Sequence, residues 1–201
     1  MKTDYVQDVL QHLNVTKIYK MNFKELFKKH WMALIVPFGV VLDQVSKYIA
    51  RENLTGKGTI WIIKDLFGWT LSYNYGAAWS ILSELTWLLT IFSVLMTAAV
   101  VWFYIKKHNE MKPLYKLVTM FIITGAIGNL IDRAFMGKVT DFINFNFFIL
   151  FDSTFPIFNV ADMFVVAAMI GILILCFFDK DFDKIFTFKK KEVTKDDSTT
   201  N

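Results

Sequence analysis

Three aspartates stand at the charged ends of apolar segments, and these are the residues of the chain best placed for chemistry. Asp132 and Asp141 lie in the stretch TGAIGNLIDRAFMGKVTDF, and Asp162 ends the later motif FNVAD. An aspartate at the bilayer centre costs about 2.5 to 3.5 kcal/mol on insertion scales, so acids beside hydrocarbon indicate function by default. We interpret Asp141 and Asp162 as a catalytic pair at a membrane surface.

The chemistry open to such a pair is proton transfer. Two carboxylates about 3 Å apart cannot both ionise, and sharing one proton separates their apparent pKa values. The ionised member can take a proton from water while the protonated member hydrogen-bonds a carbonyl group. Asp141 and Asp162 come from different segments, so they can face each other across a cleft.

The same physics leaves a cation or proton site equally open, so a small ion-coupled transporter or channel is the alternative function. Transporters usually place their sites near the bilayer midplane and often carry internal repeats. No repeat is visible in this sequence, and the acids fall at one edge of the apolar runs.

Other chemistries lack their motifs. Neither HExxH nor GxSxG occurs, and His12, His30 and His108 lie in segments away from the acids. Cys176 is the single cysteine, which rules out an intramolecular disulfide and a thiolate metal cluster. A zinc protease and a serine mechanism are therefore disfavoured, and we expect no metal and no cofactor.

The elements that must position the acids are membrane helices. The chain has 201 residues, of which 55% are hydrophobic and 21 are Phe, far more apolar material than a soluble core of this size needs. A helix needs about 20 apolar residues to cross about 30 Å of hydrocarbon. The runs of that length cover residues 31–50, 85–105, 114–131 and 158–178. We predict a mainly α integral membrane protein with four transmembrane helices.

Lysine and arginine gather in alternate loops. They are frequent before residue 31, between the second and third runs and after the fourth, whereas the other loops hold few: Arg51, Lys57, Lys64, Arg133 and Lys138. By the positive-inside rule both termini are cytoplasmic and the sparse loops face outward. The net charge of +4 is therefore explained by the membrane topology and by contact of the basic loops with anionic lipid. We expect no nucleic-acid partner.

The first outward loop reads differently from the spans. The segment GWTLSYN alternates apolar or aromatic residues with polar ones and is preceded by glycine punctuation, which is typical of strands. We predict a small extracytoplasmic antiparallel β-sheet at about residues 54–80. A phenylalanine-rich stretch at about 142–156 is predicted to be an aromatic loop in the outer interface.

The remaining segments are terminal. Residues 1–30 have the apolar spacing of an amphipathic helix and are predicted to lie on the cytoplasmic membrane surface. Residues 31–179 form the four-span domain. Residues 180–201 include KKKEVTKDDSTTN and are predicted to be a basic, disordered cytoplasmic tail.

Polar side chains converge at one depth, the outer ends of the runs. Asp43 and Lys47 are four residues apart, so on a helix they share a face and can pair. The pair can be structural, or Asp43 can orient a loop while Lys47 neutralises it or meets a lipid phosphate. Asp132 and Arg133 can likewise form an interfacial salt-bridge cluster. The other members at this depth are Asn74, Asn129, Asp141, Asn159 and Asp162.

Four motifs between the runs resemble a known family. VLDQVSK, NYGAAWS, GNLIDRAFMGKVTDFI and FNVAD, in this order, resemble the lipoprotein signal peptidase (type II signal peptidase) family of bacteria over roughly residues 33–178. The resemblance implies an aspartyl endopeptidase with catalytic residues Asp141 and Asp162. The residues that it implies in substrate binding or site support are Asp43, Lys47, Asn74, Gly76, Gly128, Asn129, Asp132, Arg133, Asn159 and Ala161.

The resemblance also implies a substrate and a location. The family removes the signal peptide from diacylglyceryl-modified prolipoproteins by cutting before the lipidated Cys, without a metal, and is sensitive to globomycin. We thus expect lipid-modified prolipoproteins and membrane lipids as partners, a monomer, and residence in the bacterial cytoplasmic membrane with the active site at the extracytoplasmic leaflet. The chain departs from the family pattern at Trp79, where Phe is usual, and at Thr140, where an apolar residue is usual.

Overall fold

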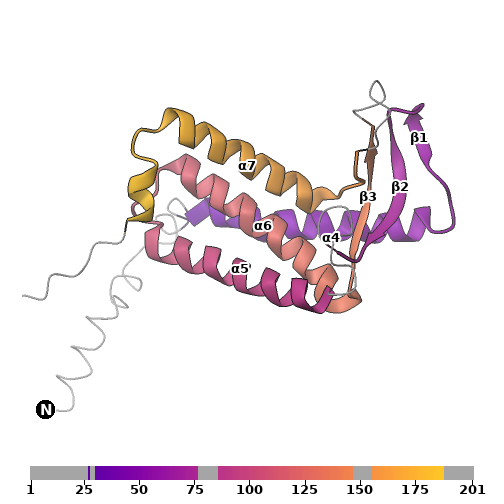
Figure 1. The fold of residues 1–201 in the computed structure, drawn as a ribbon, viewed down its shortest axis with the longest axis horizontal. Coiled ribbons are helices and arrows are strands. Elements are labelled where there is room, and N and C mark those ends of the chain that lie inside the picture. Colours follow the sequence, from indigo (N-terminus) through magenta and orange to yellow (C-terminus); the bar gives the residue numbers. More distant parts are fainter. Residues whose placement is uncertain (1–26, 28–29, 77–85, 147–154, 188–201) are drawn as a thin grey trace, which may run out of the picture.

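Four long helices run side by side with a small sheet across one end (Figure 1). This computed structural model describes residues 27, 30–76, 86–146 and 155–187. The helices are α4 (Ile35–Leu54), extended at its start by the 3-10 turn η1 (Trp31–Leu34), α5 (Thr86–Lys107), α6 (Pro113–Met136) and α7 (Val160–Phe178). All four are long and apolar enough to cross a membrane, which confirms the predicted helical membrane fold.

Apolar side chains point outward along these helices, as lipid-facing residues do. Phe38 of α4 is 74% exposed, Leu95 of α5 is 61% exposed and Phe177 of α7 is 79% exposed. In water such a surface would drive aggregation, whereas in a bilayer it is the surface that contacts the lipid chains. The single cysteine, Cys176, is also exposed on α7.

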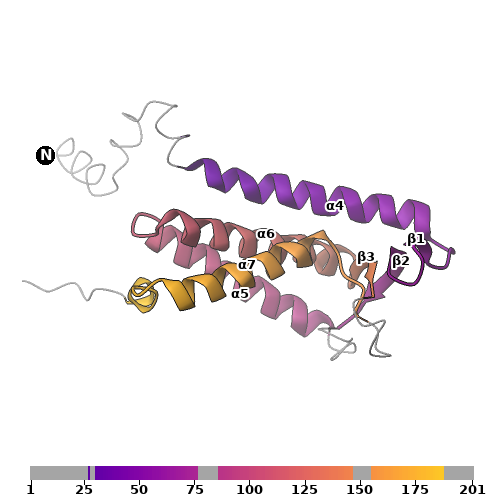
Figure 2. The ribbon, with the colours of Figure 1, turned by 90° about the horizontal axis from the view of Figure 1, so that it is seen from above.

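Helix α6 is the centre of the bundle, because it contacts each of α4, α5 and α7. Figure 2 shows α4 along one side of the group formed by the other helices. Small residues allow the close approach. A Cβ on Gly125 would lie 2.5 Å from the carbonyl oxygen of Ala161 in α7, and a Cβ on Gly39 of α4 would lie 2.5 Å from Cγ2 of Thr124. Glycine at these two positions therefore allows α6 to approach α7 and α4 closely.

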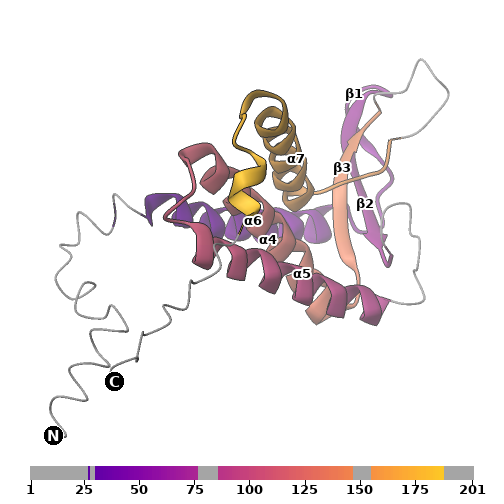
Figure 3. The same cartoon turned by 60° about the vertical axis from the view of Figure 1, so that its left-hand side comes forward.

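The sheet has three antiparallel strands in the order β1 (Ile60–Ile63), β2 (Phe67–Asn74) and β3 (Val139–Phe145). Pairing of β2 with β3 puts Ser72 opposite Asp141 and Asn74 opposite Val139. The helical turn at Gly137 (φ 67°), a left-handed position that favours glycine, directs the chain from α6 into β3. Figure 3 shows β3 crossing the end of the helices.

Strand β3 corrects the sequence interpretation, which placed an aromatic loop from Phe142 onwards. Residues 139–143 are all buried, because Phe142 packs with Ala50 and Leu54 of α4 while the next side chain back, Asp141, contacts Asn159 before α7. A strand buried on both faces has no alternation to reveal it. The central part of the predicted loop, residues 147–154, lies outside the described residues, as does the predicted N-terminal helix apart from residues 27 and 30.

The opposite end of the bundle is closed by residues 179–187, here called the C-terminal clasp, which include the 3-10 turn η4 (Asp183–Phe186). Phe182 stacks on Tyr115 of α6 with ring centroids 6.2 Å apart, and Ile185 is buried in the core at this end. Lys107 of α5, itself buried, donates to the carbonyl oxygen of Thr187 at 2.6 Å.

The clasp also contains a polar anchor. Asp179 accepts hydrogen bonds from Lys112 Nζ at 2.7 Å and 2.8 Å and from the Tyr115 hydroxyl at 3.0 Å. These donors hold the pKa of Asp179 below its usual value. The prediction of a disordered tail from residue 180 is therefore wrong for residues 180–187, because Phe182 stacks on Tyr115 and Ile185 is buried in the core there. Residues 188–201 lie outside the described residues.

The clasp predicts a stability effect. Ile185→Ala removes buried apolar surface and should lower the free energy of unfolding by about 2 kcal/mol, which is roughly 4–8 °C in Tm. The matched control is Asp183→Ala, an exposed position in the same turn. Thermal unfolding in detergent measures both, and equal melting temperatures for the two variants would show that the clasp does not support the fold.

Candidate active site

The deepest part of the site is a buried charge group, here called the Lys47 layer, made of Asp43, Gln44, Lys47 and Asp132. Lys47 Nζ lies 2.9 Å from Asp43 Oδ2 and 3.5 Å from Asp132 Oδ2, and all three side chains have no exposed surface. The i, i+4 pair expected within α4 is thus present. Lys47 also joins α4 to α6, because Asp132 belongs to α6.

Gln44 completes this layer, and sequence reasoning missed it. Its Nε2 donates to Asp43 Oδ2 at 3.1 Å, to the carbonyl oxygen of Gly128 at 3.0 Å and to Asp132 Oδ1 at 3.3 Å. Helical spacing gave no signal for it, because position i+1 lies about 100° away from Asp43 around the helix. Its place inside the VLDQVSK motif was the only available indication.

The two acids of the Lys47 layer hold backbone groups of other elements. Asp43 Oδ1 accepts the N–H of Ala161 in the first turn of α7 at 2.8 Å, and Asp132 Oδ2 accepts the N–H of Thr140 in β3 at 2.8 Å. The first turn of a helix has free N–H groups that need acceptors. A Cβ on Gly128 would lie 2.7 Å from Asp43 Oδ2, so glycine leaves room for this contact.

A second group, here called the Asn159 layer, contains Asn129, Asp141, Asn159 and Asp162. Asn159 Nδ2 donates to Asp141 Oδ1 at 2.6 Å and to Asn129 Oδ1 at 3.1 Å, while Asn129 Nδ2 donates to Asp162 Oδ1 at 2.8 Å. Lys47 Nζ donates to Asn129 Oδ1 at 3.0 Å and so links the two layers. The structure therefore brings Asp141 of β3 and Asp162 of α7 into one network.

The local cause of this arrangement is the start of α7. Asn159 caps the helix, because its side chain accepts the N–H of Asp162 at 3.0 Å and Asp162 Oδ2 accepts the N–H of Asn159 at 3.0 Å. This reciprocal pair is a capping box. The cap fixes the direction of both side chains, so Asn159 reaches Asp141 and Asp162 faces Asn129.

The third part of the site comes from β2 and the end of α6. Asn74 Oδ1 accepts the N–H of Gly76 at 3.0 Å, and Arg133 Nη2 donates to the carbonyl oxygen of Gly76 at 3.2 Å. Asn74 also lies near Asp141 and lowers the pKa of its carboxyl. Asp132 and Arg133, which could have formed one cluster, point to different partners. Arg133 Nε is buried with no hydrogen-bond partner among the described residues.

The electrostatics distinguish Asp141. Burial, and after it the negative charge of Asp162, raise the pKa of its carboxyl to about 7. A hydrogen bond from Asn159, the charge of Lys47 and the nearby side chain of Asn74 oppose this shift only in part. Near neutral pH, Asp141 thus exists in both protonation states, as a proton-transfer group requires.

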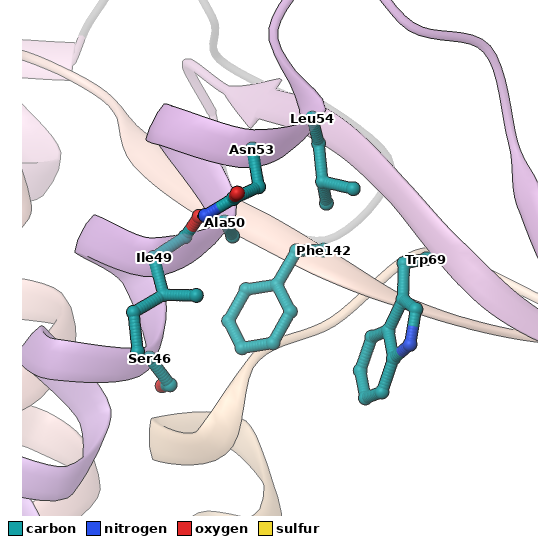
Figure 4. Close-up of a pocket in the computed structure, with 7 residues that line it drawn as sticks. All are labelled: Ser46, Ile49, Ala50, Asn53, Leu54, Trp69 and Phe142. Carbon is teal, nitrogen blue, oxygen red and sulfur yellow. The ribbon is translucent and has the colours of Figure 1, made fainter.

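Two cavities lie at this end of the helices, and one of them is lined by residues of the site. A hollow of about 250 Å³ between α5, α6 and α7 is lined by Asn129 and Arg133 together with apolar side chains. The other cavity, of about 270 Å³, is lined by the end of α4 with Trp69 and Phe142 and contains none of the acids (Figure 4). Phe142 follows Asp141 and therefore points to the other face of the strand.

Every residue predicted for the site from the sequence has a place in this constellation: Asp43, Lys47, Asn74, Gly76, Gly128, Asn129, Asp132, Arg133, Asp141, Asn159, Ala161 and Asp162. Within the described residues no group of three or more His, Cys, Asp or Glu side chains has the arrangement to hold a metal ion.

Four membrane-spanning helices with two aspartates from separate segments joined in one polar network have the form of a membrane-embedded aspartic peptidase. The sequence model of signal peptidase (SPase) II matches residues 35–178. The chain belongs to the signal peptidase II family.

Named relatives and solved structures agree with this assignment. The lipoprotein signal peptidase of Caldanaerobacter subterraneus subsp. tengcongensis is 38% identical over 71% of this chain and 94% of its own length. That of Clostridium novyi is 35% identical over 70% of this chain and 93% of its own. Two solved structures of a bacterial membrane enzyme, at 1.9 and 2.3 Å resolution, are 35% and 36% identical. Their TM-scores are 0.63 and 0.64; they cover 74% and 81% of this chain and 93% of their own chains.

The Lys47 layer predicts a large stability effect. Lys47→Met keeps the length of the side chain but leaves two buried carboxylates without their counter-charge, which should cost about 3–5 kcal/mol. Lys57→Met, an exposed position beyond the same helix, is the control and should melt like the parent. Thermal unfolding decides, and an unchanged Tm for Lys47→Met would contradict this account.

The raised pKa of Asp141 predicts a pH-dependent stability effect. Between the ordinary value of 3.8 and about 7 the folded state holds a proton that the unfolded state has released, so Asp141 reduces stability increasingly as pH rises through that window. The Tm of Asp141→Asn, relative to the parent, should therefore rise from pH 4 to pH 7 and then level off. Asp65→Asn, at an exposed turn between β1 and β2, supplies the baseline; a parallel pair of Tm curves for Asp141→Asn and the parent would refute the shift.

Proposed function

We propose that the chain is the endopeptidase that removes the signal peptide from diacylglyceryl-modified prolipoproteins, cutting before the lipidated Cys, with Asp141 and Asp162 as the catalytic pair. The single observation that carries this proposal is that Asp141 and Asp162 both hydrogen-bond Asn159 at the sheet end of the membrane helices. Membership of the signal peptidase II family supports the substrate class.

The hydrogen bonds suggest different roles for the two acids. Both oxygens of Asp162 accept N–H groups, from Asn129 at 2.8 Å and from Asn159 at 3.0 Å, and such donors suit a negative charge. Asp162 then takes a proton from the attacking water. Asp141, with its pKa raised to about 7, keeps its proton and donates it toward the scissile carbonyl oxygen.

The peptide on either side of the bond needs partners as well. The Nε of Arg133 has no hydrogen-bond partner within the part of the chain that the structure describes, so it is a candidate donor for a substrate carbonyl group. A buried donor without a partner costs free energy, so a peptide whose carbonyl group accepts a hydrogen bond from this donor gains affinity. Asn74 holds the backbone at Gly76 and so shapes the edge along which the peptide lies.

The height of the site matches a lipid-anchored substrate. A diacylglyceryl group keeps the modified Cys at the membrane interface, which is the level at which helices end and sheet begins. The hollow lined by Asn129 and Arg133 ends beside Asn129, which hydrogen-bonds Asp162, and is the side from which the substrate would approach. Lysines are frequent at the clasp end, among them Lys106, Lys107 and Lys112, so by the positive-inside rule the clasp end is cytoplasmic and the acids are extracytoplasmic.

The remaining properties follow from the same proposal. Residues 31–179 would be the peptidase domain in the bacterial cytoplasmic membrane, residues 1–30 a surface extension, and the protein a monomer inhibited by globomycin. The ion-coupled transporter is not favoured, because family membership points to a peptidase and the acids lie at one end of the spans.

The decisive experiment is cleavage of a lipidated precursor by purified protein in lipid. Asp141→Asn and Asp162→Asn should each lower kcat at least about 100-fold, because an amide cannot transfer the proton. Both variants should keep a folded thermal transition. Asp65→Asn, a surface acid at the same end of the molecule, should retain full activity.

Two further arms sharpen the result. The same precursor without its diacylglyceryl group should be cut poorly, and a chelator should leave cleavage of the lipidated precursor unchanged. Parent-like turnover in Asp141→Asn or Asp162→Asn would end the assignment of the pair, and loss of activity on chelation would point to a metal instead.

A further inference from the structure

One charged side chain next to the site has no role in the chemistry proposed above. Arg51 lies in the last turn of α4 and is partly buried. Its Nη1 donates to Thr140 Oγ1 at 3.0 Å. Thr140 has no exposed surface and immediately precedes Asp141 in β3. We propose that Arg51 and Thr140 are positioning residues that set the place of the Asp141 carboxyl, an inference that rests on the function proposed for Asp141.

Thr140 is held from three directions. Its backbone N–H donates to Asp132 Oδ2 of α6 at 2.8 Å. In the sheet, Thr140 lies opposite Tyr73 of β2. Its hydroxyl oxygen accepts a hydrogen bond from the Arg51 guanidinium of α4. The first two contacts use the backbone and exist for any residue, whereas the third needs a side-chain acceptor at position 140 and a long donor at position 51.

The hydroxyl contact controls rotation of the strand. Thr140 and Asp141 point to opposite faces of β3, so a twist of the strand that moves one side chain moves the other. Two backbone contacts leave such a twist possible, and a third contact on the side chain opposes it. Asp141 Oδ1 accepts from Asn159 Nδ2 at 2.6 Å, and rotation of the strand would lengthen this hydrogen bond.

Two simpler explanations of Arg51 make different predictions. A cation near a helix C-terminus interacts favourably with the helix dipole, and Lys would serve equally. A long side chain can also pack α4 against β3, as Leu54 does with Phe142 and Ile143 in one buried cluster. Neither explanation needs the Thr140 hydroxyl, so a substitution that removes only that hydroxyl separates them from a positioning role.

The variants follow from this comparison. Thr140→Val keeps the side-chain shape and removes the acceptor, and Thr140→Ser restores it. Arg51→Met removes the donor, Arg51→Lys keeps only the charge, and the double variant Arg51→Met with Thr140→Val tests coupling. Leu54→Ala, which loosens the same α4 and β3 contact without touching the hydrogen bond, is the matched control. If Thr140→Val does not fold, the Arg51 variants carry the test, because Arg51 is only partly buried.

The measurement is kcat and KM for a lipidated precursor across pH, together with Tm. Thr140→Val and Arg51→Met should each lower kcat about 10- to 100-fold, the scale of a misplacement near 1 Å, with KM changed by less than about threefold. The double variant should be no worse than either single variant, since both break one contact. Thr140→Ser should recover most of the activity, and Arg51→Lys should not.

The pH profile gives a readout that loose packing does not move. The charged groups that act on Asp141 are Asp162 of α7, Lys47 of α4 and Arg133 of α6, and none of them is altered in these variants. A displaced Asp141 changes its distance to all three, so the alkaline limb of kcat should shift in Thr140→Val and Arg51→Met. Leu54→Ala should lower Tm and leave that limb in place.

The outcomes separate this inference from the proposed function. Three outcomes would each overturn the positioning role: a parent-like kcat and pH profile in Thr140→Val and Arg51→Met, additive losses in the double variant, or the same profile shift in Leu54→Ala. In each case, loss of activity in Asp141→Asn would still establish the catalytic pair. If the parent protein does not cleave the precursor, the proposed function fails first and this inference fails with it.

Discussion

The structure depends on a single ammonium group held among carboxylates away from solvent. Lys47 Nζ lies 2.9 Å from Asp43 and 3.5 Å from Asp132, and none of the three side chains is exposed. Each charge would be costly to bury alone. The carboxylates accept further hydrogen bonds, from Gln44 and from the backbone of α7 at Ala161 and of β3 at Thr140. The need to satisfy these charges therefore fixes where a helix begins and where a strand lies.

The geometry of the Asn159 layer depends on the Lys47 layer. Asn159 and Asp162 serve twice, as the two halves of a helix cap and as members of the site. A cap is rigid because each partner satisfies the other, so residues that carry one are well suited to hold acids in a set orientation. Asn129 connects both levels by accepting from Lys47 and donating to Asp162. Stability and site geometry thus share the same atoms at this end of the molecule.

The two ends of the bundle solve different problems. At the sheet end, buried polar groups are matched by specific hydrogen bonds, and glycine at 128 admits the Asp43 carboxyl where a Cβ would lie 2.7 Å away. At the clasp end, aromatic stacking and the seat of Ile185 close the core. Between them the helices expose apolar side chains to lipid, so little of the bundle is specified by burial alone. Specific contacts at the two ends of the bundle therefore determine much of how the helices are arranged.

Sequence by itself determined the spans, because twenty apolar residues in a row have no other solution in a bilayer, and it determined the participants, because polar groups beside hydrocarbon stand out. It also revealed the Asp43 and Lys47 pair through helical spacing. It did not reveal Gln44, strand β3 or the clasp. Gln44 acts on atoms of another helix, and β3 is buried on both faces and shows no alternation. The clasp is a short segment whose partners lie more than sixty residues away, in α5 and α6. Those contacts exist only once distant segments pack together, so only the tertiary structure could decide them.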